Sequence, residues 1–401
     1  MAADDVSDWY SALLPALALC FSPGNVLLLG TAVGTVYLSA LRAIHEERSL
    51  GRGGSSDAMF TLDGYTAICV PVMGSVCLII MFFFFASISQ LYTLFIAFGA
   101  AVALAFAAEP PFLVLWRSLG LYTNTPPDGA VALSQETPRC MGFVRKAPLH
   151  TKVLGCLSGA LVVLWLLSGH WILNNMLGCS ICVFAVSHVR LPNVKVCAIL
   201  LTSLFVYDVF WVFYSTSVFG SNVMLHVVQQ KSSSPIQTAL SAMNVTAPAG
   251  LARSLDPPVK LLVPTRLPGS RRTVFNVLGL GDIALPGFLL ALVACFDQKR
   301  CKNDPLVPLG RALPPANGSY LLRATAGYAV GLLVTMVSGA ASGAAQPALM
   351  YLVPAVLLPV VLTARQHKEF GDVWSGKRPS FCSCCSFKGR TSADEDCGRV
   401  Q

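Results

Sequence analysis

Two aspartates stand apart from the other acidic residues of this 401-residue chain, because apolar residues flank them on both sides. Asp208 lies within the apolar residues 198–213, and Asp282 lies within residues 277–290. Both stretches are apolar enough to cross a bilayer, where an ionised carboxylate costs roughly 2.5 to 3.5 kcal/mol on insertion scales. A chain that bears this cost twice is expected to use both carboxylates in its function.

The two carboxylates can act as an acid–base pair if they lie at one depth. With the outer helix ends near Phe219 and Arg272, each aspartate is about ten residues, or about 15 Å, into its span. Two carboxylates in contact cannot readily both ionise, so they would share a proton. The ionised member then takes a proton from attacking water, while the protonated member donates to a peptide carbonyl. This is the chemistry of aspartic proteases, and the sequence does not assign acid and base.

The residues around Asp282 favour an irregular backbone that can receive a substrate. Gly279 and Gly281 have no side chains, so another backbone can approach them closely. Pro286 and Gly287 are expected to weaken the helix one turn later. Irregular backbone is tolerated at membrane depth only where it lines a cavity. We therefore expect a site assembled from interrupted helices.

Composition assigns the class of protein independently of these motifs. The chain is 54% hydrophobic and 12% charged, with a mean hydropathy of +0.64, which predicts an all-α polytopic membrane protein. A soluble chain of this balance could not cover its apolar surface. Runs of about 20 apolar residues predict about nine transmembrane helices, at residues 11–40, 65–86, 89–115, 153–171, 173–189, 196–219, 273–296, 320–341 and 346–364.

The predicted spans divide the chain into three parts. Residues 1–172 would hold the first four helices as a scaffold, residues 173–364 the five catalytic helices with a luminal loop at 220–272, and residues 365–401 a cytosolic tail. The first span lacks the basic segment of a cleaved signal peptide, so we expect it to be retained as an anchor. Pro23 is expected to kink it.

Charge orients these spans. With the N-terminus in the lumen, the inner loops and the tail hold 21 of the 28 Lys and Arg residues, which predicts a luminal N-terminus and a cytosolic C-terminus. Asn244, in a sequon of the luminal loop, is then a glycosylation candidate, whereas Asn317 should stay bare. The cysteines from Cys382 to Cys385, near the membrane in the tail, favour palmitoylation.

Three short motifs follow one another on the late spans: Tyr207-Asp208, then Gly279 to Asp282 with the sequence Gly-Leu-Gly-Asp, then Pro-Ala-Leu at 347–349. In this order they resemble the motifs of the signal peptide peptidase family of intramembrane aspartyl proteases, over roughly residues 65–365. The resemblance implies a presenilin-like intramembrane protease fold with Asp208 and Asp282 as the catalytic pair. It also implies site-lining and substrate-binding residues, namely Tyr207, Gly279, Leu280, Gly281, Gln346, Pro347, Ala348 and Leu349.

The resemblance also implies substrates and a location. Type II membrane proteins or signal peptides would be cleaved, in the Golgi, the endoplasmic reticulum or both. Phe82 to Phe85 and the absence of a large luminal domain resemble the signal peptide peptidase-like 3 branch, which implies glycosyltransferases as substrates. We expect no metal and no organic cofactor. We also expect no nucleic acid as a partner, because the net charge of +8 is that of loops facing anionic membrane lipids. A homo-oligomer is compatible with the sequence.

Two other functions compete with the protease. The aspartates by themselves favour a proton-coupled transporter, where paired intramembrane acids form a proton relay. Transporters are often built from internal repeats, and no convincing repeat relates the two halves of this chain. A non-catalytic scaffold that binds membrane-protein clients is the third hypothesis, and it would have no reason to bear the insertion cost of intact aspartates.

Overall fold

The computed structural model describes a helical membrane protein. It covers residues 22–50, 60–120, 148–230, 232–235, 238, 254–266, 273–300, 319–342 and 346–376. Within these residues nine helical segments are long and apolar enough to cross a membrane, which confirms the predicted fold class. They span Pro23–Glu47, Gly64–Phe85, Ser87–Ser118, Leu149–Ser168, Trp171–His188, Val194–Phe219, Gly281–Lys299, Tyr320–Ser342 and Leu349–Gln366.

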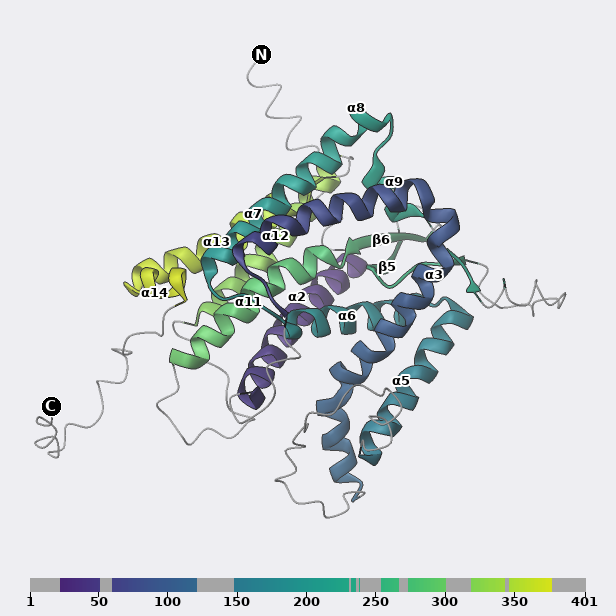
Figure 1. Ribbon diagram of the computed structural model, residues 1–401, viewed down its shortest axis with the longest axis horizontal. Coiled ribbons are helices and arrows are strands. Elements are labelled where there is room, and N and C mark those ends of the chain that lie inside the picture. Colours follow the sequence, from purple (N-terminus) through teal and green to yellow (C-terminus); the bar gives the residue numbers. More distant parts are fainter. Residues whose placement is uncertain are drawn as a thin grey trace, which may run out of the picture.

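Eleven helices and three short strand pairs make up the described elements (Figure 1). The helices are α2 (Pro23–Leu50), α3 (Gly64–Ser118), α5 (Leu149–Ser168), α6 (Trp171–His188), α7 (Val194–Val209), α8 (Ser215–Phe219), α9 (Val223–Gln229), α11 (Gly281–Arg300), α12 (Tyr320–Ser342), α13 (Leu349–Gln366) and α14 (Phe370–Ser375). The strands pair as β1 (Phe60–Thr61) with β2 (Val189–Arg190), β3 (Ser232–Ser233) with β4 (Ser254–Leu255), and β5 (Lys260–Arg266) with β6 (Thr273–Gly279). Figure 1 shows that α3 bends, so this one long helix supplies two spans.

The first described helix begins later than the sequence predicts. Helix α2 starts at Pro23, so this proline occupies the first helical residue, where its missing N–H leaves no bond unmade. The expected kink within the span is therefore wrong for the described residues. The part of the predicted span before residue 22 lies outside them.

The predicted span at 273–296 is also wrong over its first third. Residues 273–279 form β6, which pairs antiparallel with β5, and the helix begins only at Gly281. The strand sequence Thr-Val-Phe-Asn-Val is rich in β-branched and aromatic residues, which fit a pleated sheet better than a helix. Asp282 is consequently a first-turn residue, and the estimate that it lies about ten residues into a helix does not hold.

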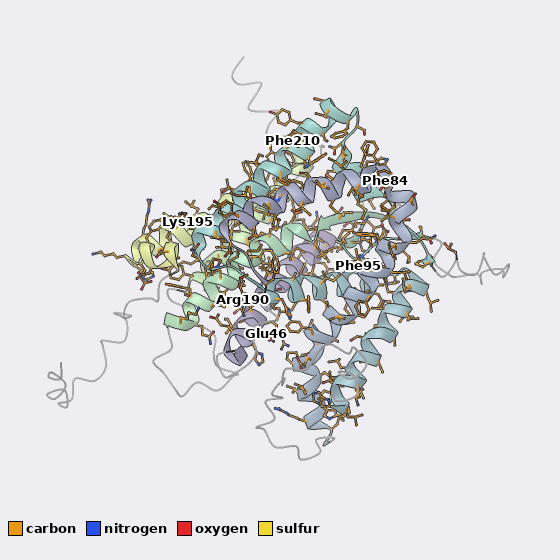
Figure 2. The ribbon with its side chains drawn as sticks, in the orientation of Figure 1. Glu46, Phe84, Phe95, Arg190, Lys195 and Phe210 are labelled. Atoms are coloured by element: carbon orange, nitrogen blue, oxygen red, sulfur yellow. The ribbon has the colours of Figure 1, made fainter. Side chains whose placement is uncertain are left out.

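Helix α2 packs against α11, α6 and strand β5. Gly24 makes this approach possible, because a Cβ there would overlap the Thr265 hydroxyl. Large apolar side chains elsewhere face outward, as Figure 2 shows for Phe84, Phe95 and Phe210, which are 58%, 76% and 42% exposed. Such an exposed apolar surface is expected of a protein whose solvent is lipid.

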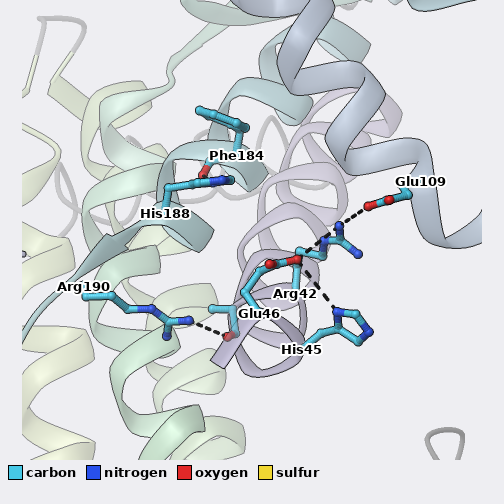
Figure 3. A network of polar contacts seen from close by, with 8 residues as sticks. Arg42, His45, Glu46, Glu109, Phe184, His188 and Arg190 are labelled. Carbon is cyan, nitrogen blue, oxygen red and sulfur yellow. Dashed lines mark hydrogen bonds and ion pairs between the residues drawn. The ribbon is translucent and has the colours of Figure 1, made fainter. Parts of the chain in front are cut away.

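Charged side chains join α2 to α3, β2 and α11, and Figure 3 shows the contacts of Arg42 and Arg190 among them. Arg42 donates to Glu109 of α3 at 2.8 Å, and Lys299 of α11 pairs with Glu47 of α2 at 2.7 Å. Arg190 reaches the same Glu47 at 3.8 Å. Because single exposed ion pairs contribute little, the joint arrangement rather than any one pair fixes these helix ends.

Helices α12 and α13 lie unusually close. Gly327 and Gly331 are four residues apart on α12 and face α13, where a Cβ on Gly327 would overlap the Ala355 carbonyl oxygen. A Cβ on Gly331 would come within 2.8 Å of the Ala355 Cβ. Two small residues at this spacing allow membrane helices to approach backbone to backbone.

Replacing Gly327 by leucine should lower the thermal unfolding temperature of the protein in detergent. The new side chain has no space beside Ala355, and overpacking of this kind costs about 1–3 kcal/mol. Gly339→Leu is the matched control, because a Cβ there meets no atom within 4 Å. Equal unfolding temperatures for the two variants would contradict the close α12–α13 packing.

Candidate active site

Helix α7 carries Asp208 into the interior. The helix is capped by Asn193, whose side chain accepts a hydrogen bond from the Val196 N–H at 2.8 Å, and it packs against α3 and α13. Asp208 is 5% exposed and lies one residue before α7 ends. Residues Phe210–Tyr214 then form one π-helical turn, a feature that is frequent at functional sites.

The beginning of α13 holds the Asp208 carboxylate. Leu349, the first residue of α13, donates its backbone N–H to the Asp208 Oδ2 at 3.0 Å. Pro347 precedes the helix, and its carbonyl accepts from the Met350 N–H at 3.2 Å, so the first turn forms directly after the proline. The carboxylate therefore faces the positive end of the helix dipole. This contact gives the Pro-Ala-Leu motif a structural role.

Asp282 lies in the first turn of α11. The Leu280 carbonyl starts this helix by accepting from the Ala284 N–H at 2.8 Å, and α11 continues through Pro286 to Arg300. Gly279 lies under the aspartate, since a Cβ there would come within 3.3 Å of the Asp282 Oδ2. A Cβ on Gly281 would meet no atom within 4 Å, so space is open beside the aspartate on this side.

The two predicted residues lie on helices that pack against one another. Asp208 is at the end of α7 and Asp282 is in the first turn of α11, and both helices also pack against α13, which holds the Asp208 carboxylate. The sequence instead predicts the two aspartates at equal depth along two straight helices.

The β5–β6 hairpin leads directly into Asp282, and α6 covers its β5 edge. Asn175 of α6 donates to the Leu262 carbonyl and accepts from the Leu262 N–H, both at 2.8 Å. Asn174 donates to the Lys260 carbonyl at 3.0 Å. These amides take the place of a neighbouring strand, a role that sequence reasoning missed because no local signal shows which strand lies opposite α6.

The other predicted site residues lie around the pair or beside it. Tyr207 is half-buried and its ring packs over Gly74 of α3, while Leu280 is buried. Gln346 bonds to Ser342 at 3.1 Å, away from Asp208. Other predictions concern residues outside the described ranges, namely Asn244, Asn317 and the cysteines from Cys382 to Cys385.

Two aspartates that converge between helices of a polytopic membrane protein are the arrangement of an intramembrane aspartic protease. The family model described as signal peptide peptidase matches residues 54–380, so the chain belongs to the signal peptide peptidase family.

Its curated relatives agree. The signal peptide peptidase-like 1 protein of Oryza sativa subsp. japonica is 40% identical over 370 residues, covering 90% of this chain and 95% of the relative. Its Arabidopsis thaliana counterpart is 38% identical over 90% of this chain and 94% of its own length. The signal peptide peptidase of Mus musculus is 29% identical over 88% and 82%. No solved structure matches the chain. The predicted enzyme class, aspartic endopeptidase, is therefore confirmed, and the transporter hypothesis is set aside.

Gly279→Ala should slow peptide cleavage about tenfold or more without unfolding the protein. The methyl group would press on the Asp282 carboxylate, and a small misplacement of a catalytic group has large kinetic effects. The turnover number of the purified variant on a membrane-spanning reporter measures this. Gly155→Ala, where the new methyl meets no atom within 4 Å, is the control. An unchanged turnover number for Gly279→Ala would contradict the close contact.

Proposed function

We propose that Asp208 and Asp282 are the catalytic pair of this protease and that together they activate one water molecule. The observation that carries the proposal is the mutual packing of α7, α11 and α13, which brings Asp208 and Asp282 to the same part of the bundle, with Asp208 held by the Leu349 N–H at 3.0 Å. Two carboxylates so placed share a single proton, because both cannot readily ionise in contact. One can therefore act as base while the other acts as acid.

The surroundings of the pair support a division of roles. The Leu349 N–H and the positive end of α13 both favour a negative charge on Asp208. We assign Asp208 as the base that takes a proton from the attacking water. Asp282 then gives its proton to the oxygen of the peptide carbonyl, which forms a neutral tetrahedral diol. Collapse of the diol returns a proton to the leaving amine and breaks the C–N bond.

The edge of β6 that faces away from β5, which pairs with no strand among the described residues, is proposed as the place where an unwound substrate lies. In the antiparallel register, the Leu280 N–H bonds to the Val259 carbonyl, so the backbone groups of Phe275, Val277 and Gly279 point away from β5. Asn174 and Asn175 already occupy the opposite edge of the hairpin. An extended substrate segment that paired with β6 would run past Asp282 with its peptide bond exposed.

The substrate class and membrane orientation follow as proposals from the sequence. Type II membrane proteins, glycosyltransferases among them, or signal peptides are the proposed substrates. The distribution of Lys and Arg supports a luminal N-terminus and a cytosolic C-terminus. The Golgi, the endoplasmic reticulum or both are the proposed location, and a homo-oligomer the proposed assembly. The division into a scaffold at 1–172 and a catalytic part at 173–364 stays a prediction.

Asp208→Asn and Asp282→Asn should each abolish cleavage of a type II transmembrane reporter by the purified protein in liposomes. Each amide keeps the size of the side chain but can neither accept nor give up a proton near neutral pH, so we expect a loss of about a thousandfold or more. Product appearance on a gel measures it. Cleavage at the wild-type rate by either variant would contradict the assignment, and a well-folded wild type that cleaves no type II protein or signal peptide would favour a non-catalytic scaffold.

Val277→Pro should lower cleavage at least tenfold while leaving the unfolding temperature close to that of the wild type. Proline removes the N–H that points away from β5, so the β5–β6 bonds are kept while pairing with a substrate is lost. Pro264, at an equivalent outward position of β5, shows that this hairpin tolerates proline there.

Val277→Ala is the control for the lost side chain, because it keeps the N–H. Wild-type cleavage by Val277→Pro, or equal losses in the two variants, would contradict strand pairing at β6.

A further inference from the structure

Tyr328 of α12 has a buried hydroxyl group without a hydrogen-bond partner among the described residues. The whole side chain is 0% exposed, and its ring belongs to the same apolar core as Leu280 and Ile283. A buried hydroxyl without a partner is unfavourable, so its retention in a core position asks for an explanation. A phenylalanine would fill the same volume without that cost.

The surroundings of this hydroxyl point to the active site. Helix α12, which carries Tyr328, packs against α11, which carries Asp282. Tyr328 also lies in one buried cluster with Leu280 and Ile283, which stand on either side of Asp282 in the chain. The Sγ of Cys182 lies 3.7 Å from the carbonyl oxygen of Leu280, the residue before Gly281. Tyr328 therefore lies on the α12 side of the Gly-Leu-Gly-Asp segment, in the buried core that the first turn of α11 shares with α12.

The packing of α12 fixes the ring in this place. Gly327 and Gly331 hold one face of α12 against α13. Tyr328 follows Gly327 in the chain, so it lies on another face of α12, a helix that also packs against α11. Helix α13 meanwhile supplies the Leu349 N–H to Asp208. The tightly joined α12–α13 pair thus carries both the Tyr328 hydroxyl and the Leu349 N–H.

We propose that Tyr328 is a positioning residue for Asp282, whose hydroxyl donates a hydrogen bond to the Asp282 carboxyl group when substrate is bound. The inference rests on the proposed role of Asp282 as the acid. Catalytic hydrogen bonds are often long without substrate and tighten in the complex that reacts, which agrees with a nearby but unbonded pair.

The donor acts on the charge that develops during the reaction. Asp282 is neutral before it gives its proton to the peptide carbonyl and becomes a carboxylate afterwards. A hydrogen bond to a carboxylate is roughly twice as strong as one between neutral groups, so the Tyr328 bond strengthens as the proton leaves. Interactions that are stronger in the transition state than in the ground state raise the turnover number and leave substrate binding unchanged.

The experiment compares Tyr328→Phe with the wild type in liposomes on a type II reporter, measuring kcat and KM separately. We expect kcat to fall about 10- to 100-fold with an unchanged KM, as when one preorganised donor is removed. Tyr320→Phe is the matched control: this residue is also 0% exposed on α12, but its hydroxyl bonds to Glu369 at 3.2 Å. The control should cleave at the wild-type rate.

A second measurement separates this role from a structural one. The affinity of Tyr328→Phe for a non-cleavable peptide with the reporter sequence should equal that of the wild type. A wild-type kcat for Tyr328→Phe beside an inactive Asp282→Asn would overturn this inference alone. A loss of peptide affinity and unfolding temperature in step with kcat would also overturn it, by assigning Tyr328 to packing. Cleavage by Asp282→Asn would overturn the proposed function and this inference with it.

Discussion

The hydrogen bond from the Leu349 N–H to Asp208 joins α7, which carries this aspartate, to the beginning of α13. Helix α13 can offer this N–H only because it begins directly after Pro347, with its first turn aimed at the carboxylate. The same helix is locked to α12 through Gly327 and Gly331. A buried carboxylate is costly without a hydrogen-bond partner. The burial of Asp208 therefore depends on the position of α13, which α12 helps to fix.

A sheet edge inside a membrane-spanning protein needs the same kind of compensation. Lipid offers no hydrogen bonds, so backbone N–H and carbonyl groups at membrane depth must find partners within the protein. The hairpin meets this demand unequally: Asn174 and Asn175 pair with the β5 edge, while β6 presents the other edge beside Asp282. An edge of this kind readily accepts another extended chain. A peptide bond can be hydrolysed in an extended segment, where it is not enclosed in a helix.

The sequence predicted the helical class and the family, because long apolar runs and three ordered motifs are local signals. It misread residues 273–279, since a short apolar run beside a longer one cannot be told from a continuing helix by periodicity. The roles of Asn174 and Asn175 depend on which strand lies opposite α6, which is a tertiary fact. Tyr328 carries no motif, and only its burial in one cluster with Leu280 and Ile283 marks it.

The most direct test of the two-aspartate site is the affinity of a substrate peptide in which a tetrahedral hydroxyl group replaces the scissile carbonyl. Such a peptide resembles the diol intermediate, so it should bind the wild type at least about a hundredfold more tightly than the parent peptide. Asp208→Asn and Asp282→Asn should each lose this advantage while still binding the parent peptide. An advantage that survives in either variant would contradict a site built from both carboxylates.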